Sequence, residues 1–315
     1  MARLIGRRLA QLVAVLLIVS FLTFLMLHLL PADPAYAILG QNATDAQVEA
    51  IHQQLGLDQP FVVQYLDWLG SLLTGDLGTS LRSKESVSEA LASRLPVSLE
   101  LAVLATLMSL AFAIPAGVFA AYRSGGKFDR LASAAASTMV AIPGFVLGIF
   151  LVYVFAYQLP VLPVSGWVPF SDNPAENLRH AVLPAITLAA VEAAVFMRVL
   201  RSDMHDTLQE NFILAARAQG LPKQNVLWRS ALRPSSMSLV TLAGVSLGRL
   251  IGGTVLAEVI FALPGVGQLL VQSIYASDVV MVQGIVIVLV TGVVLINLLV
   301  DVLYMYLDPR VRQAA

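Results

Sequence analysis

Long apolar stretches without formal charge restrict the fold of this chain more than any other feature. Four of them run for at least 22 residues, at positions 9–32, 101–122, 131–157 and 279–300. A helix needs about 20 apolar residues to cross the roughly 30 Å hydrocarbon core of a bilayer, where every backbone polar group must be bonded internally. The sequence therefore predicts an all-α polytopic membrane protein.

Two further apolar stretches contain charged residues. Residues 181–197 include Glu192, and residues 237–261 include Arg249 and Glu258. With the four uncharged stretches they predict six transmembrane helices. The first apolar run, of 24 residues, is longer than that of a secretory signal, which has about 7–15 residues. Residues 1–32 are therefore predicted to form an uncleaved N-terminal anchor helix.

Composition supports a membrane protein and excludes several other classes. Only 12% of the residues are charged and 58% are hydrophobic, whereas a soluble domain carries about 25% charged residues. A formal charge of -1 gives no global field to attract nucleic acid, and the chain has no cysteine for thiolate metal sites. The four histidines lie far apart in the sequence. We therefore expect a lipid bilayer as the surroundings, no nucleic-acid partner, and no metal or other cofactor in this chain.

Basic residues predict how the chain is oriented. With the N-terminus inside, 14 Lys and Arg residues flank the spans on the cytosolic side and four on the outer side. Since basic flanks resist translocation, both termini are predicted to be cytosolic. Residues 33–96 then form an external helical segment, and residues 97–315 a five-helix core. This core contains a long, polar, cytosolic segment at about 199–236, which is the part best suited to meet a soluble partner.

Two common motifs, one for nucleotide binding and one for catalytic zinc, are absent from the sequence. The Gly-x-x-x-x-Gly-Lys-Ser/Thr phosphate-binding loop does not occur, and neither does the His-Glu-x-x-His zinc pattern. The chain is therefore not expected to be an enzyme, and no catalytic residue is assigned.

The cytosolic segment carries the most specific motif. Ala215 and Ala216, followed by Gly220 and later by Leu232, resemble the EAA loop of importer-type ABC-transporter permeases. In that family the loop forms two short helices with a turn at the glycine and docks into a groove of the ATPase subunit. The motif differs here in having Leu214 in place of Glu and Arg233 between the final Leu and Pro.

Further stretches resemble the B-type permease of dipeptide and oligopeptide importers, from end to end of the chain. They are residues 4–35, 55–81, 141–167, 250–270 and 297–312. The resemblance implies a type I ABC importer permease core in a bacterial cytoplasmic (inner) membrane, crossing it several times. It also implies ATP-driven import of dipeptides or oligopeptides, with nickel chelates or glutathione as alternatives.

The resemblance implies a set of partners as well. These are a homologous C-type permease subunit, two cytosolic ABC ATPase subunits that bind ATP and Mg, an extracytoplasmic substrate-binding protein, and the peptide substrate. Seven residues are candidates for the ATPase-coupling loop: Ala215, Ala216, Arg217, Gly220, Leu221, Leu232 and Arg233. For the basic residues, the alternative is that a cytosolic loop is basic for reasons of topology alone. For the alanines and glycine, the alternative is helix packing within the chain.

Ionisable residues within the spans are candidates for the translocation pathway, because charge at membrane depth usually faces a cavity or a partner. They are Arg249, Glu258, Glu192 and Asp301. Arg249 is expected either to pair with Glu192 or Asp301, or to contact a substrate carboxylate. Glu258 is expected to reach the outer interface. It lies nine residues after Arg249, about 180° around a helix, so the two are not an intrahelical pair.

Glycines in the fifth predicted span recur every four residues. Gly244, Gly248 and Gly252 form a stripe that predicts close approach of another helix, in this chain or in the partner permease.

Two rival functions are of a different class. An intramembrane protease or lipid-modifying enzyme could use Glu192, Asp301 or His180, but the sequence lacks paired acids or a nucleophile with its base. Hydrolysis by the purified chain alone would favour it. A self-sufficient channel or secondary carrier would show uptake insensitive to ATP depletion. Neither rival accounts for the basic cytosolic segment around Gly220.

Overall fold

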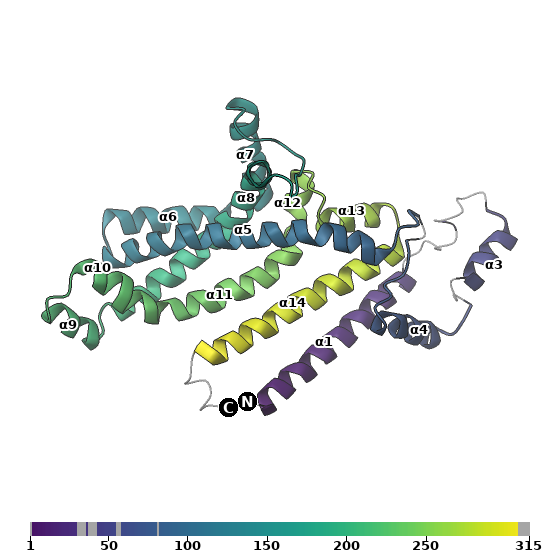
Figure 1. Cartoon of the computed structure of the whole chain (residues 1–315), viewed down its shortest axis with the longest axis horizontal. Coiled ribbons are helices and arrows are strands. Elements are labelled where there is room, and N and C mark those ends of the chain that lie inside the picture. Colours follow the sequence, from purple (N-terminus) through teal and green to yellow (C-terminus); the bar gives the residue numbers. More distant parts are fainter. Residues whose placement is uncertain (1, 30–35, 37–42, 55–57, 81, 308–315) are drawn as a thin grey trace. The chain divides into compact units, whose positions relative to one another are not determined.

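The computed structural model of the chain shows only helices as regular elements in the part it describes (Figure 1). The described residues are 2–29, 36, 43–54, 58–80 and 82–307. Two compact units are present: residues 1–97 with 265–294, and residues 98–264 with 295–315. Residues 265–294 thus group with the N-terminal residues, and the five-helix core 97–315 stays a prediction.

The first unit contains α1 (Ala2–Leu29), α3 (Asp45–Gln54) and α4 (Phe61–Leu73). Aromatic rings join α1 to α4. The ring of Phe24 lies 5.3 Å from that of Phe61 and 5.5 Å from that of Tyr65, both at steep angles. The hydroxyl groups of Ser20 and Tyr65 are 2.9 Å apart and share a hydrogen bond. Because edge-to-face rings attract beyond their buried area, these contacts hold α4 against the end of the N-terminal helix.

The remaining elements of the first unit are the start of α5 (Val87–Tyr122), α13 (Val266–Tyr275) and the start of α14 (Val279–Leu307). They enclose a core in which Val87 and Ile285 are fully buried. A Cβ atom added to Gly284 would lie 2.4 Å from Cγ1 of Val87, so only glycine permits this approach of α14 to α5.

The second unit is built around α8 (Pro174–Thr207), which contacts α6, α7, α11 and α12. Its start follows from capping: Asn173 accepts a hydrogen bond from the backbone N–H of Glu176, and Pro174 occupies the first turn. The helix continues beyond the predicted span 181–197. The first residues of the segment predicted to be cytosolic, 199–207, therefore form the last turns of α8. Phe196, Leu200 and Met204 are fully buried within the core of this unit.

The other elements of the second unit surround α8. They are the rest of α5, α6 (Lys127–Ala141), α7 (Gly144–Leu151), the π-helix η1 (Val152–Gln158), α9 (Asn211–Ala218), α10 (Lys223–Asn225), the π-helix η2 (Val226–Ala231), α11 (Leu232–Gly253), α12 (Val255–Ile260) and the end of α14.

The third predicted span is bent. Helix α6 and the α7–η1 pair meet at an angle of 101°. The break falls at Ile142 and Pro143, whose backbones are extended. A proline disfavours helical geometry in the residue before it and has no N–H to continue the helix, which explains the interruption. Residues 131–157 are therefore either a broken span or a re-entrant segment.

Four described helices are long and apolar enough to cross a membrane, and the bent pair would make a fifth. The four lie at Val87–Tyr122, Pro174–Thr207, Lys223–Gly253 and Val279–Val300. In α1 the described apolar part, Ala10–Leu25, is shorter than a full crossing. Six spans and cytosolic termini remain predictions; residues 308–315 with Arg310 and Arg312 lie outside the described residues. The fifth predicted span, 237–261, is interrupted, because α11 ends at Gly253 and α12 follows after Thr254.

The three glycines of the predicted stripe have different surroundings in α11. A Cβ added to Gly244 would lie 2.5 Å from Cγ2 of Val300 in α14, and Gly248 is buried. Gly252 is exposed, and an added Cβ would meet no atom within 4 Å. Among the described residues, the stripe therefore makes no continuous contact with another helix.

Alanine substitutions at Gly244 and Gly252 should change stability in opposite directions. Gly252→Ala is expected to raise the free energy of unfolding by about 0.5–1 kcal/mol, because alanine loses less backbone entropy in a helix. Gly244→Ala should lower it by about 1–3 kcal/mol through overpacking against the stiff β-branched Val300. Thermal unfolding of the detergent-purified chain measures both. Equal shifts at the two positions would contradict the close contact at Gly244.

Candidate functional site

The motif predicted to be cytosolic folds as a helix, a glycine turn and a second helix. The N–H of Gly220 donates to the carbonyl of Arg217 at 3.0 Å, and the N–H of Leu221 donates to the carbonyl of Ala216 at 3.3 Å. This pair of bonds is a Schellman motif, which requires a left-handed residue after the helix end. Gly220 has φ of 79°, and no neighbour would contact an added Cβ. The glycine is therefore required by backbone conformation, as its place in the motif suggested.

One face of this hairpin is anchored in the core of the second unit. Ile213 of α9 is fully buried, and Val226, Leu227 and Ala231 of η2 pack in the same cluster. Val226, Leu227 and Ala231 therefore point inward, while Lys223, Trp228 and Arg229 stay exposed. In the chain, α9 of the hairpin follows α8, and η2 leads into α11. The buried residues therefore fix the hairpin between these two helices.

The opposite face presents apolar side chains to solvent. Phe212 and Leu214 are about half exposed, and so is Leu221 beyond the turn. Exposed apolar side chains clustered on one face are typical of a surface that another protein covers. Leu214, which stands where the general motif has Glu, contributes to this apolar face.

The structure places the seven predicted coupling residues on three elements. Ala215, Ala216 and Arg217 lie on α9, with Ala216 half-buried and the other two exposed. Gly220 and Leu221 form the exposed turn. Leu232 and Arg233 instead begin α11, where Leu232 packs against the core and Arg233 is exposed. Only the first five are therefore together at the turn.

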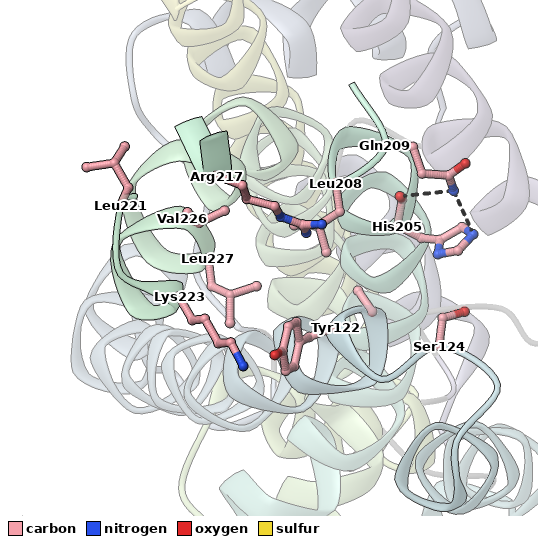
Figure 2. Close-up of a pocket in the computed structure, with 11 residues that line it drawn as sticks. Tyr122, Ser124, His205, Leu208, Gln209, Arg217, Leu221, Lys223, Val226 and Leu227 are labelled. Atoms are coloured by element: carbon pink, nitrogen blue, oxygen red, sulfur yellow. Dashed lines mark hydrogen bonds between the residues drawn. The ribbon is translucent and has the colours of Figure 1, made fainter. Parts of the chain in front are cut away.

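A cavity of about 590 Å³ lies beside the hairpin (Figure 2). Its polar lining is Tyr122, Ser124, His205, Gln209, Arg217 and Lys223, and its apolar lining is Ala121, Leu208, Leu221, Val226 and Leu227. Figure 2 shows Arg217 extending toward Leu208, and Lys223 extending toward Tyr122. His205 and Gln209 are joined by a hydrogen bond of 3.0 Å.

The cavity is cationic. None of the lining residues is acidic, and among the described ion pairs neither Arg217 nor Lys223 has a carboxylate partner. Sequence reasoning did not find this cavity, because its walls come from the ends of α5 and α8 as well as from the hairpin. No local pattern marks Tyr122 or His205 as neighbours of Gly220.

An ion pair holds the turn between α5 and α6 beside this cavity. Asp129 is buried and accepts a hydrogen bond of 2.8 Å from the N–H of Gly125. Arg201 of α8 donates to both carboxylate oxygens of Asp129, from Nη2 at 2.7 Å and from Nε. A two-pronged guanidinium–carboxylate contact fixes orientation as well as distance. The α5–α6 turn is therefore fastened to α8 just before the coupling hairpin.

Two of the ionisable residues predicted for the pathway meet in the structure. Nη2 of Arg249 in α11 lies 2.6 Å from Oε1 of Glu192 in α8. Of the two predicted acidic partners, Glu192 is the one in contact; the side chain of Asp301 lies outside the described residues. The Arg249 side chain nevertheless remains 67% exposed.

Glu258 does not reach an interface, and that expectation was wrong. It is fully buried, and its Oε1 atom accepts hydrogen bonds from Ser98 at 2.6 Å and from Thr254 at 2.7 Å. The short helix α12 that follows α11 directs Glu258 into the interior instead of along the outer end of a continuous span.

A short pattern in α11 resembles a hydrolase motif but lacks its context. Residues 244–248 read Gly-Val-Ser-Leu-Gly, which matches the Gly-x-Ser-x-Gly sequence around many serine nucleophiles. That motif works at a sharp strand-to-helix turn, whereas these residues lie within a helix and Ser246 is buried. No group of three or more His, Asp or Glu that could hold a metal occurs among the described residues. Neither feature supports an enzyme.

Comparison with known families agrees with this arrangement. Residues 113–313 match the family described as binding-protein-dependent transport system inner membrane component. Residues 1–102 match the N-terminal family of the same transport-system membrane components. The chain belongs to this family of transport permeases. It is therefore a multi-pass inner membrane protein and the membrane component of an ABC transporter.

Individual relatives of the permease align over almost their whole length. A Brucella abortus (strain 2308) protein, provisionally named a peptide transport system permease, is 44% identical over 312 residues, 99% of each chain. The glutathione transport system permease protein GsiC of Salmonella typhimurium is 39% identical over 307 residues, 97% of each chain. A solved inward-facing MetNI methionine ABC transporter matches 70% of this permease and 96% of its own chain, with a TM-score of 0.59 and 18% identity. The last similarity shows a shared fold.

Removing the Asp129 charge should destabilise the permease much more than removing a surface charge. Asp129→Asn leaves the partly buried guanidinium of Arg201 without a counter-charge, so the free energy of unfolding should fall by about 2–3 kcal/mol. Glu176→Gln breaks the exposed pair with Arg179 and should cost about 0.5 kcal/mol or less. Thermal unfolding of the two purified variants compares them, and similar losses would contradict a structural role for Asp129.

Proposed function

We propose that this permease forms half of the pore of an ATP-driven peptide importer and is coupled to cytosolic ATPase subunits through the hairpin around Gly220. The observation that carries the proposal is end-to-end similarity to permeases named for peptide and glutathione transport. Dipeptides and oligopeptides are the proposed substrates. Glutathione, itself a small peptide, and nickel chelates remain the alternatives within the same architecture.

The hairpin has the mechanical features that coupling needs. Its exposed face offers apolar side chains and Arg217 to a docking subunit, while its buried face is packed into the core of the second unit. A displacement applied at Gly220 would be transmitted to α8 through α9, which follows it in the chain. It would also be transmitted to α11, because η2 leads directly into that helix. Rigid helices joined in this way convert docking movements into rocking of the pore-forming unit.

The other subunits are proposed from the family. A binding-protein-dependent system requires an extracytoplasmic substrate-binding protein, for which the external segment 33–96 is the proposed docking surface or gate. A homologous C-type permease would complete the pore. Two cytosolic ABC ATPases would bind ATP and Mg, and the cationic cavity next to Gly220 offers them charged contacts in addition to the hairpin.

Replacing Gly220 with a β-branched residue should abolish ATPase association without preventing membrane insertion. Valine strains the left-handed backbone at φ 79°, whereas asparagine tolerates it, so Gly220→Val should lose the ATPase subunits and Gly220→Asn should retain most of them. Copurification of ATPase subunits with each membrane-inserted variant measures the effect.

A matched control comes from the predicted outer side. Gly75 has φ of 86° and equally open surroundings, so Gly75→Val imposes similar strain away from the hairpin and should leave ATPase association unchanged. Unchanged copurification with Gly220→Val would mean that the hairpin is not the docking element. Uptake that continues after ATP depletion would instead favour a channel or secondary carrier.

A further inference from the structure

Arg249 is an exposed cation on an apolar helix. It lies 17 residues after the start of α11, a rise of about 25 Å along the axis, in a segment long and apolar enough to span a membrane. Two-thirds of its side chain is exposed within the chain. A charge at this depth faces a cavity or another protein rather than lipid, because burial in hydrocarbon is costly.

The bond to Glu192 uses only a small part of the guanidinium. Nη2 donates to Glu192 at 2.6 Å and approaches Ser246 at 3.5 Å, whereas a guanidinium carries five N–H donors in a planar fork. The contact thus leaves donors available to a second carboxylate. Arginine is well suited to such a contact, because its fork matches the two oxygens of a carboxylate.

Glu192 is placed as a fixed support for the arginine. Its side chain is 7% exposed, and Oε2 has no hydrogen-bond partner among the described residues. A buried carboxylate with an unsatisfied oxygen is costly, so the pair is not optimised for stability alone. The carboxylate holds one edge of the guanidinium at the protein wall and neutralises its charge while no ligand is bound.

The turn of α11 that follows Arg249 exposes no bulky side chain. Gly252 and Gly253, one turn further along α11, are exposed, and a Cβ added to either would meet no atom within 4 Å. The backbone is therefore open to close approach by a ligand beside the exposed donors. The glycines alone would indicate only a flat helix face, but here they adjoin an exposed cation and a buried, partly unsatisfied carboxylate.

We infer that Arg249, held by Glu192, binds the carboxylate of the transported peptide within the translocation pathway. This inference rests on the proposed function as a peptide importer. Arg249 contacts the substrate, and Glu192 is a positioning residue that acts through it. The chemical class recognised is a peptide with a free C-terminal carboxylate, and a neutral C-terminal amide should bind more weakly.

The test is equilibrium binding of radiolabelled trialanine and its C-terminal amide to the complete transporter in nanodiscs, without the substrate-binding protein. The unaltered complex should bind the free acid about tenfold more tightly than the amide, since charge-assisted bonds to arginine are stronger than neutral ones. In Arg249→Ala the two affinities should become equal, through loss of binding to the acid. Arg249→Lys should keep part of the preference.

Two further variants separate binding from folding. Arg249→Gln combined with Glu192→Gln removes both charges at once, so no carboxylate is left uncompensated, and the preference for the free acid should also vanish. Arg179→Ala removes an exposed arginine elsewhere and should leave the preference intact.

The inference is overturned if the unaltered complex shows no preference for the acid or if the preference survives in Arg249→Ala. It is also overturned if Arg249→Ala and the double variant both lose the second permease on purification, because the arginine would then be a subunit contact. Each of these outcomes leaves the proposed function standing as long as Gly220→Val still loses the ATPase subunits.

Discussion

Inside a hydrocarbon layer the protein itself must supply a hydrogen-bond partner for every backbone amide and a counter-charge for every charged group. In this permease α8 provides several of these partners. It packs against α5, α6, α7, α11 and α12 in the second unit, and it carries Glu192 and Arg201, each of which pairs with a charge on a different helix. The same helix ends immediately before the coupling hairpin. Packing, charge neutralisation and the connection to the hairpin therefore depend on one helix.

Three buried acidic residues of the second unit, Asp129, Glu192 and Glu258, differ in how completely their charged groups are enclosed. Asp129 is buried and bonded to Arg201 and to the N–H of Gly125. Glu258 is fully buried, with hydroxyl donors from Ser98 and Thr254. The Arg249–Glu192 pair alone combines a buried acid with a largely exposed base. The carboxylates of Asp129 and Glu258 have their hydrogen-bond partners within the protein, so these residues stabilise the fold. The exposed guanidinium of Arg249 still has donors available for a ligand.

Sequence reasoning succeeded where a short segment contains its own physical cause. Gly220 could be assigned to a turn because a left-handed residue is needed after a helix, and the apolar stretches could be assigned to helices because lipid leaves few alternatives. The family could also be recognised, since its motifs run through the whole chain. These features depend on neighbours in the sequence.

The failures arose where tertiary contacts or a break in a helix decide the outcome. A single helix was assumed for 237–261, but α11 ends at Gly253. Glu258 lies in the following helix α12 and is buried, whereas it was expected at the outer membrane interface. The third predicted span was taken as one helix, and no sequence rule gives the 101° angle between α6 and the α7–η1 pair. The cationic cavity joins residues up to about a hundred positions apart, so no local pattern could reveal it.

The π-helix η2 has a consequence for how this loop can evolve. It leads into α11 without an intervening turn, so the orientation of the hairpin relative to α11 is set by the number of residues in between. Inserting or deleting one residue there would rotate the hairpin by about 100° around the helix axis and withdraw its anchoring residues from the core. Side chains on the exposed face of the hairpin can therefore change without disturbing this packing, whereas the length of the connection to α11 cannot.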